Sequence, residues 1–172
     1  MPDNRSHPDL GVFHGIGGAY YPEHHPRASW PRYAEMVKQA GLSFCRLAEF
    51  TWDKLEPREG EFDFSWLDEV MGQLDDRGIR VILCTPTAVP PLWACERYPE
   101  LHPVDESGKT IGFGVRRYTC STSRVYHQLC RDIVTAMAHR YAQHPQVLGW
   151  QIDNEVGHPF CFCPRCRRVS RA

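Results

Sequence analysis

The chain alternates between short runs of mostly apolar residues and longer segments in which apolar residues recur every three or four positions. The short runs predict strands at residues 16–21, 43–48, 79–84 and 147–152. Nearly continuous apolar runs such as residues 79–84 are typical of strands buried on both faces of a parallel sheet. The helical spacing predicts helices at residues 30–40, 64–74 and 125–141.

These elements alternate as strand and helix, which is the order of right-handed parallel βαβ units, so the predicted fold class is α/β. The alternation fits either an open, doubly wound sheet or a (β/α) barrel. No G-x-G-x-x-G motif follows the first strand, which disfavours dinucleotide binding. Polar residues follow the strand ends instead, where barrel enzymes place catalytic residues. A complete barrel has eight strands in about 250 residues, whereas four strands are predicted here.

The composition argues against nucleic acid and membranes as binding partners. The 172 residues carry a formal net charge of -1, so no basic field exists for nucleic acid or an anionic membrane. No apolar run approaches the roughly 18 residues that would indicate a membrane span. The first residues lack an apolar signal segment, so we expect a cytoplasmic location.

Asp153-Asn154-Glu155 follows the fourth predicted strand and is the strongest candidate for a catalytic motif. A carboxyl group held there in a dry pocket would have a raised pKa and would donate a proton near neutral pH. The alternative is a polar turn that ends the strand. The proline-rich segment 85–121 is predicted to be irregular, and long loops of this kind usually carry function.

Several motifs occur in an order that is similar to one enzyme family. They are Gly18-Ala19-Tyr20-Tyr21-Pro22-Glu23, Arg46-Leu47-Ala48-Glu49-Phe50-Thr51-Trp52, Leu55-Glu56-Pro57 followed by Gly60-Glu61-Phe62-Asp63-Phe64, Thr85-Pro86-Thr87-Ala88, and Gly149-Trp150-Gln151-Ile152-Asp153-Asn154-Glu155. The chain resembles the β-galactosidases of glycoside hydrolase family 42 from about Gly15 to Cys166. Agreement of separate motifs in order and spacing makes this resemblance far more specific than any one motif.

The resemblance implies a (β/α)8 barrel that hydrolyses terminal β-galactosides with retention. Residues 15–172 would form the N-terminal half of that barrel, truncated after its fourth strand, and residues 1–14 a tail. Glu155 would be the general acid/base, and Asn154 would bind the sugar near its 2-hydroxyl. Arg116 is the best match to a family arginine that binds substrate, and Arg117 is its close competitor; without the resemblance, both read as solvated residues.

Glu49 and Trp52 follow the second predicted strand. They are expected either to line the pocket or to have a structural role.

The eight cysteines fall into two groups. Cys45, Cys84, Cys95 and Cys130 lie among apolar residues and are predicted to be buried thiols. Cys161, Cys163 and Cys166 form a C-x-C-x-x-C cluster, which favours zinc held by thiolates in a tetrahedral shell. The resemblance suggests Cys120 as the fourth ligand of a structural zinc site. A redox pair of Cys163 and Cys166, or unreactive thiols, are the alternatives.

A retaining glycosidase needs a second carboxylate as its nucleophile. In the family this residue ends the seventh strand, so none is assigned within this chain, which is expected to be inactive alone. The open edges of four strands predict self-association, pairing with a C-terminal half, or poor folding. The alternative hypothesis is a zinc-bearing half-barrel that binds carbohydrate or assists assembly without catalysis.

Overall fold

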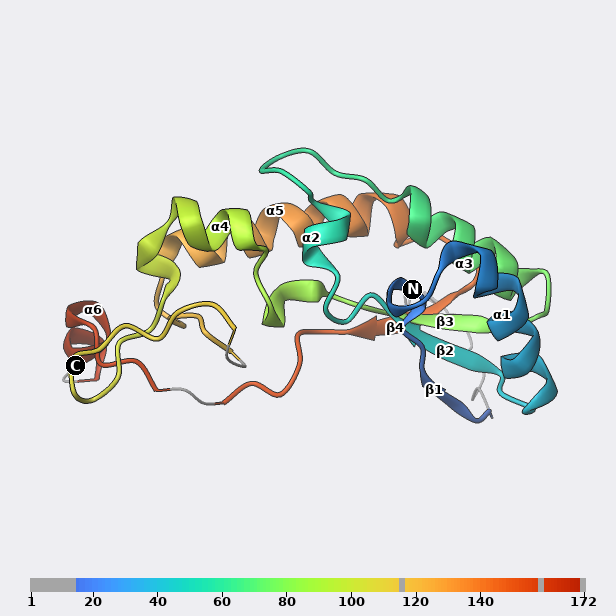
Figure 1. Ribbon diagram of the computed structural model, residues 1–172, viewed down its shortest axis with the longest axis horizontal. Helices are drawn as coiled ribbons and strands as arrows, with labels where there is room; N and C mark the ends of the chain where they lie inside the picture. The colour runs from blue at the N-terminus through green and yellow to red at the C-terminus, as the bar shows by residue number, and fades with distance from the viewer. Residues whose placement is uncertain (1–14, 115–116, 158–159, 171–172) are drawn as a thin grey trace, which may run out of the picture.

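The structure is a computed structural model that describes residues 15–114, 117–157 and 160–170. Four parallel strands form one open sheet in the order β1-β2-β3-β4. They are β1 (Gly17–Ala19), β2 (Phe44–Leu47), β3 (Arg80–Cys84) and β4 (Val147–Gln151). The four predicted strands and the α/β fold class are confirmed, and the strand order is that of consecutive barrel strands (Figure 1).

The strands pair over fewer residues than the apolar runs suggest. Ile16 and Ile152, at the outer ends of the first and last runs, are 72% and 73% exposed and lie outside the paired segments. Close pairing is needed at Gly17, where a Cβ would come within 2.5 Å of the Phe44 ring. Within the described residues, no strand pairs with the outer edge of β1 or of β4.

Each of the three predicted helices is present, and each leads into the next strand. They are α1 (Trp30–Gln39), α3 (Ser65–Asp75) and α5 (Arg124–Tyr141). The apolar stripe of each helix joins Leu47, Val81 and Leu83 of the sheet in one buried cluster. The buried Gln146 amide also donates to the carbonyls of Met71 and Ile79, at 2.9 Å each, which links the loop between α5 and β4 to α3 and to the residue before β3.

Short helices occupy segments that were predicted to be irregular. Within residues 85–121 the chain forms a 3-10 turn (Pro86–Ala88), helix α4 (Leu92–Arg97) and a second 3-10 turn (Pro99–Leu101). Helices α2 (Trp52–Leu55) and α6 (Pro164–Val169) were likewise not predicted, nor were the 3-10 turns Pro22–His24 and Arg27–Ser29. Prolines at the first helical positions start several of these turns, because proline lacks only an N–H that is unpaired there.

The molecule is elongated, with the sheet at one end and α6 at the other (Figure 1). Helix α4, the loop after it and the segment after β4 run between the two ends. Among the described residues, no helix is both long and apolar enough to cross a bilayer.

Candidate active site and cysteine cluster

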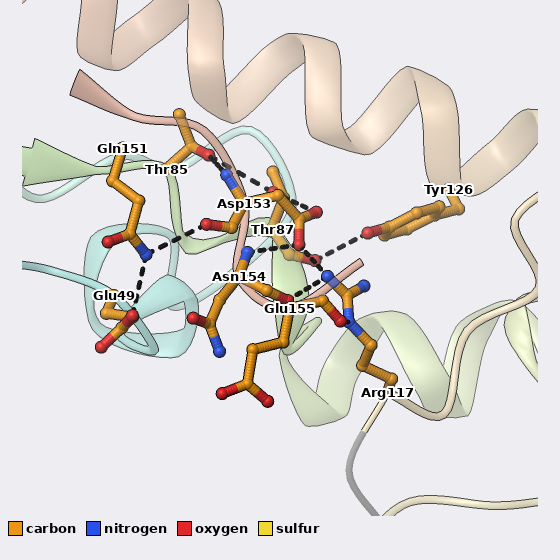
Figure 2. A network of polar contacts seen from close by, with 9 residues as sticks. All are labelled: Glu49, Thr85, Thr87, Arg117, Tyr126, Gln151, Asp153, Asn154 and Glu155. Atoms are coloured by element: carbon orange, nitrogen blue, oxygen red, sulfur yellow. Dashed lines mark hydrogen bonds and ion pairs between the residues drawn. The ribbon is translucent and has the colours of Figure 1, made fainter. Parts of the chain in front are cut away.

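Polar side chains gather where β2, β3 and β4 end (Figure 2). Glu49 follows β2, Thr85 and Thr87 follow β3, and Asp153-Asn154-Glu155 follows β4. Because parallel strands end at the same edge of a sheet, hydrogen bonds connect these ends across 66 to 105 positions of the chain. Arg46 of β2 and Gln151 of β4 take part in these bonds.

Glu49 is a buried carboxylate, only 3% exposed, with three side-chain partners. It accepts hydrogen bonds from the Tyr21 hydroxyl at 2.5 Å, the Arg46 guanidinium at 2.9 Å and the Gln151 amide at 2.8 Å. Partial burial and the bond to Glu49 raise the pKa of the Tyr21 hydroxyl, which keeps it a donor. A buried charge persists when it is paired and hydrogen-bonded in this way, so Glu49 fixes the β2 and β4 ends relative to each other.

Trp52 does not line an open rim. Its side chain is fully buried and its indole N–H donates to Glu56 at 2.7 Å. Glu56 also accepts from the backbone N–H of Gly60 at 2.8 Å, and burial raises its pKa. Of the two roles considered for Trp52, the structure therefore supports the structural one, and the Leu55-Glu56-Pro57 motif helps to anchor the following loop.

Asp153 is the centre of a second network. Its backbone N–H donates to the Thr85 hydroxyl at 2.7 Å, and its carbonyl accepts from the Gln151 amide at 3.1 Å. Its carboxylate accepts from the Thr87 hydroxyl at 2.9 Å, from the backbone N–H of Asn154 at 2.5 Å and from Arg117. Asp153 thus ties the end of β4 to the segment after β3.

Asn154 and Glu155 follow this anchored residue. Figure 2 shows their side chains directed away from the network that holds their backbone. Asn154 is partly buried and Glu155 is exposed. The expected dry pocket around Glu155 is therefore not formed by the described residues. The reason is that β4 is the outer strand of the four, so no further strand end closes that side.

Left-handed backbone conformations are concentrated at this site. Among the described residues, the non-glycine residues with positive φ are Ala48, Arg117, Asp153 and Glu155, at 69°, 53°, 57° and 47°. Such conformations cost roughly 1–2 kcal/mol per residue, and they persist where surrounding contacts hold them. The hydrogen bonds around Glu49 and Asp153 supply such contacts.

Arg116, the predicted sugar-binding arginine, lies outside the described residues. Its competitor Arg117 is described, and its side chain is only 12% exposed. The Arg117 guanidinium donates to the Asp153 carboxylate and to the backbone carbonyls of Asn154 and Glu155. Arg117 is therefore not the solvated residue that its sequence context alone suggests.

The four predicted metal ligands meet at one point. The sulfurs of Cys120, Cys161, Cys163 and Cys166 all lie within 4.8 Å of one another. Cys120 Sγ lies 3.8 Å from Cys163 Sγ and 3.5 Å from Cys166 Sγ. Tetrahedral zinc with Zn–S bonds near 2.3 Å requires sulfurs about 3.8 Å apart, so these spacings fit such an ion.

The cysteine thiols of this cluster differ in pKa. Burial opposes ionisation of Cys163, but hydrogen bonds from the Cys166 backbone and the neighbouring thiols outweigh it and lower its pKa to about 7. Burial and the adjacent thiols raise the pKa of Cys166 to about 12. Backbone N–H groups of Val104 and Cys166 point at Cys161 Sγ and Cys163 Sγ, at 3.4 and 3.5 Å. Such donors favour thiolates, the form in which cysteine binds metal, although burial outweighs the Val104 bond and raises the pKa of Cys161.

The other four cysteines behave as apolar side chains. Cys45, Cys84 and Cys95 are buried, as predicted, whereas Cys130 is only partly covered. Burial raises the pKa of Cys45 to about 11 and that of Cys84 and Cys130 to about 12. These thiols stay protonated and chemically quiet at neutral pH.

Sequence comparison gives a consistent set of relatives. The model of glycoside hydrolase family 42, described as β-galactosidase, matches residues 19–172. The β-galactosidase BgaA of Thermus sp. and the β-galactosidase of Thermus thermophilus are each 46% identical over 159 residues, or 91% of this chain. The chain spans about a quarter of the length of these relatives, 25% in both cases.

Solved structures agree with this assignment. The β-galactosidase of the Antarctic haloarchaeon Halorubrum lacusprofundi is 42% identical and superposes with a TM-score of 0.81, covering 86% of this chain and 23% of that one. The cold-adapted β-galactosidase of Rahnella sp. R3 is 36% identical with a TM-score of 0.85, covering 91% and 24%. The open four-stranded sheet therefore corresponds to the N-terminal part of the barrel in these enzymes.

Proposed function

Because this chain belongs to the family 42 β-galactosidases, we propose that the protein hydrolyses terminal β-D-galactosides with retention and that these residues supply the N-terminal part of its barrel. The observation that carries the proposal is the placement of Asn154-Glu155. The pair follows the carboxyl end of a parallel strand, with its backbone held and its side chains directed outward (Figure 2). Barrel enzymes carry catalytic residues at that position.

Glu155 is proposed as the general acid/base. In the first step its protonated carboxyl donates to the glycosidic oxygen as the bond to the leaving group breaks. In the second step its carboxylate accepts a proton from the water that attacks the galactosyl–enzyme intermediate. The nucleophile is proposed to lie on a later barrel strand. Acid catalysis alone contributes roughly 10²–10⁴-fold, or about 3–5 kcal/mol of the roughly 8–23 kcal/mol that enzymes supply, so these residues alone would not suffice.

Two neighbouring residues are proposed to bind the sugar. Asn154 is directed to the same side as Glu155 in Figure 2, and its amide is proposed to hydrogen-bond near the 2-hydroxyl. Arg116 is proposed as a further sugar contact on the basis of the family resemblance, and it lies outside the described residues. Arg117 is a weaker candidate for that role because its guanidinium is already used by the backbone after β4.

We also propose that Cys120, Cys161, Cys163 and Cys166 hold a structural zinc ion. Support comes from the convergence of four sulfurs within 4.8 Å, one of them from the loop before α5 and three from the segment before and within α6. The ion would bind both segments together. A redox role for Cys163 and Cys166 would need only these two thiols and gives no reason for Cys120 and Cys161 to meet them.

Assembly is part of the proposal. The outer edges of β1 and β4 offer unpaired backbone groups to further strands. Beside them lie the exposed side chains of Ile16 and Ile152. We propose that the rest of the barrel pairs with these edges, so that the galactoside site is completed only with the remaining strands.

The experiment uses a chimera in which this chain replaces the matched quarter of the Thermus thermophilus β-galactosidase. We expect hydrolysis of a chromogenic β-galactoside but not of the α-anomer. Glu155→Gln should lower kcat by about 10²–10⁴-fold, whereas Glu106→Gln, at an exposed turn, should leave it unchanged. Galactose binding without turnover in the unsubstituted chimera would contradict the proposal and would favour a non-catalytic, carbohydrate-binding half-barrel.

A further inference from the structure

We propose that Arg117 is a positioning residue for the acid/base, acting through the backbone of the turn that carries Asn154 and Glu155. This inference rests on the proposed function of Glu155. It adds a role for a residue whose guanidinium lies on the opposite side of the turn from the Asn154 and Glu155 side chains (Figure 2).

Arg117 contacts the turn after β4 through two backbone carbonyls and the Asp153 carboxylate. Arg117 Nε donates to the Glu155 carbonyl, and one terminal nitrogen donates to both the Asn154 carbonyl and the Asp153 carboxylate. One planar guanidinium therefore holds three consecutive residues, which its fixed fork of donors permits and a lysine ammonium does not. The side chains of Asn154 and Glu155 take no part in these three bonds, and Figure 2 shows them directed away from the network that holds their backbone.

The turn needs such a restraint. Asp153 and Glu155 have φ values of 57° and 47°, and Arg117 itself has a φ of 53°. Residues other than glycine rarely adopt this region, because their Cβ is crowded there. Removing the guanidinium would free the turn to relax toward ordinary conformations, and the direction of the Glu155 carboxyl would change with it.

Both the segment that carries Arg117 and the residue that accepts its hydrogen bond are anchored. It lies three residues before Cys120, which belongs to the cysteine cluster, and next to Tyr118, whose buried hydroxyl donates to the Pro90 carbonyl at 2.6 Å. Its acceptor Asp153 is fixed by Thr85 and Thr87. The guanidinium thus bridges two anchored segments, which is what a rigid placement of Glu155 requires.

A misplaced acid has a specific kinetic signature. Cleavage of the glycosidic bond needs proton donation when the leaving group is basic, as with phenolate, but hardly at all with dinitrophenolate. A displaced Glu155 should therefore slow the reaction more as the pKa of the leaving group rises. A loss of folded protein would instead slow all substrates by one factor.

The test measures kcat/KM of the chimera with phenyl, nitrophenyl and dinitrophenyl β-galactosides, for Arg117→Met and Arg117→Lys. We expect about 10- to 100-fold lower values on the phenyl substrate, with the lysine variant following the same trend. The loss on the dinitrophenyl substrate should be several-fold smaller, because only the displaced sugar contact of Asn154 affects that substrate. Arg124→Met, at an exposed position that begins α5, is the matched control and should match the parent on every substrate.

Equal loss on all three substrates, or no loss with either variant, would overturn the role of Arg117. The ratio between substrates does not depend on how much active protein is present, so a variant that folds in low yield still decides the question. Glu155→Gln is measured in parallel. If it keeps the parent rate on the phenyl substrate, the proposed function of Glu155 fails, which is a different result from failure at Arg117.

Discussion

Two regions of this molecule are stabilised in different ways. The sheet region, residues 16–101 and 124–151, contains almost all the buried apolar side chains, including Leu47, Leu83 and Ile133. The cysteine region, residues 102–114, 117–123 and 160–170, has only Tyr118 and Cys120 among its described residues that are buried and apolar, and α6 buries no residue. A segment with so small a core needs another source of stability, and metal ligation is a common one.

The proposed acid lies at the junction of these regions. Glu155 follows the last strand of the sheet region and precedes Cys161 by six residues. Its turn is held by Thr85 and Thr87 from one region and by Arg117 from the other. If Arg117 positions Glu155 as proposed, both regions contribute to the direction of the Glu155 carboxyl, the sheet region through Thr85 and Thr87 and the cysteine region through Arg117.

The largest expected effect comes from removing one ligand. Cys166→Ser should abolish metal binding and the hydrogen-exchange protection of residues 117–123 and 160–170, while the sheet region keeps its protection. Structural zinc sites supply about 10–16 kcal/mol of apparent binding free energy, far more than the few contacts of this region. The measurement is hydrogen exchange by mass spectrometry together with the zinc-to-protein ratio.

Cys45→Ser is the matched control, because Cys45 is buried in the sheet region. It should weaken the sheet but leave about one zinc ion per chain. A zinc-to-protein ratio near zero in reduced, unsubstituted protein would remove the zinc proposal and with it this account of the cysteine region.

A smaller effect is expected from the apolar core. Ile133 on α5 is fully buried, so Ile133→Ala should lower the free energy of unfolding of the sheet region by about 2–5 kcal/mol. The zinc-to-protein ratio should not change. Urea denaturation followed by tryptophan fluorescence measures the loss.

Ile152→Ala makes the same chemical change at a site that is 73% exposed, and in this chain it should shift stability by no more than about 0.5 kcal/mol. Similar losses for the two variants would mean that the surface beside β4 is covered in solution. The contrast between a packed sheet and an open outer edge would then be wrong.

Much of the sheet region could be predicted from the sequence. The mostly apolar runs located all four strands, because strands buried in a parallel sheet have few polar positions, here Arg46, Arg80 and Gln151. Helical spacing located α1, α3 and α5. Short helices such as α4 and α6 were missed, because six residues are too few to show a period.

The site was predicted in part. Asn154 and Glu155 follow β4 as expected, and the four cysteines converge. The networks around Glu49 and Asp153 were not foreseen. Their partners Gln151 and Thr85 belong to motifs, but they lie more than 60 residues away in sequence, and no motif shows which residues will meet across that separation. The sequence predicts Arg117 only as a competitor for sugar binding, since nothing local indicates that its guanidinium meets backbone carbonyls.

The most direct test of the central claim is azide rescue of the Glu155→Ala chimera with dinitrophenyl β-galactoside. If Glu155 is the acid/base, azide should restore turnover and yield β-galactosyl azide. The reason is that azide needs no proton removed to attack the anomeric carbon and displace the enzyme's nucleophile. Full activity without azide would contradict the account. So would formation of α-galactosyl azide, because that product would identify Glu155 as the nucleophile.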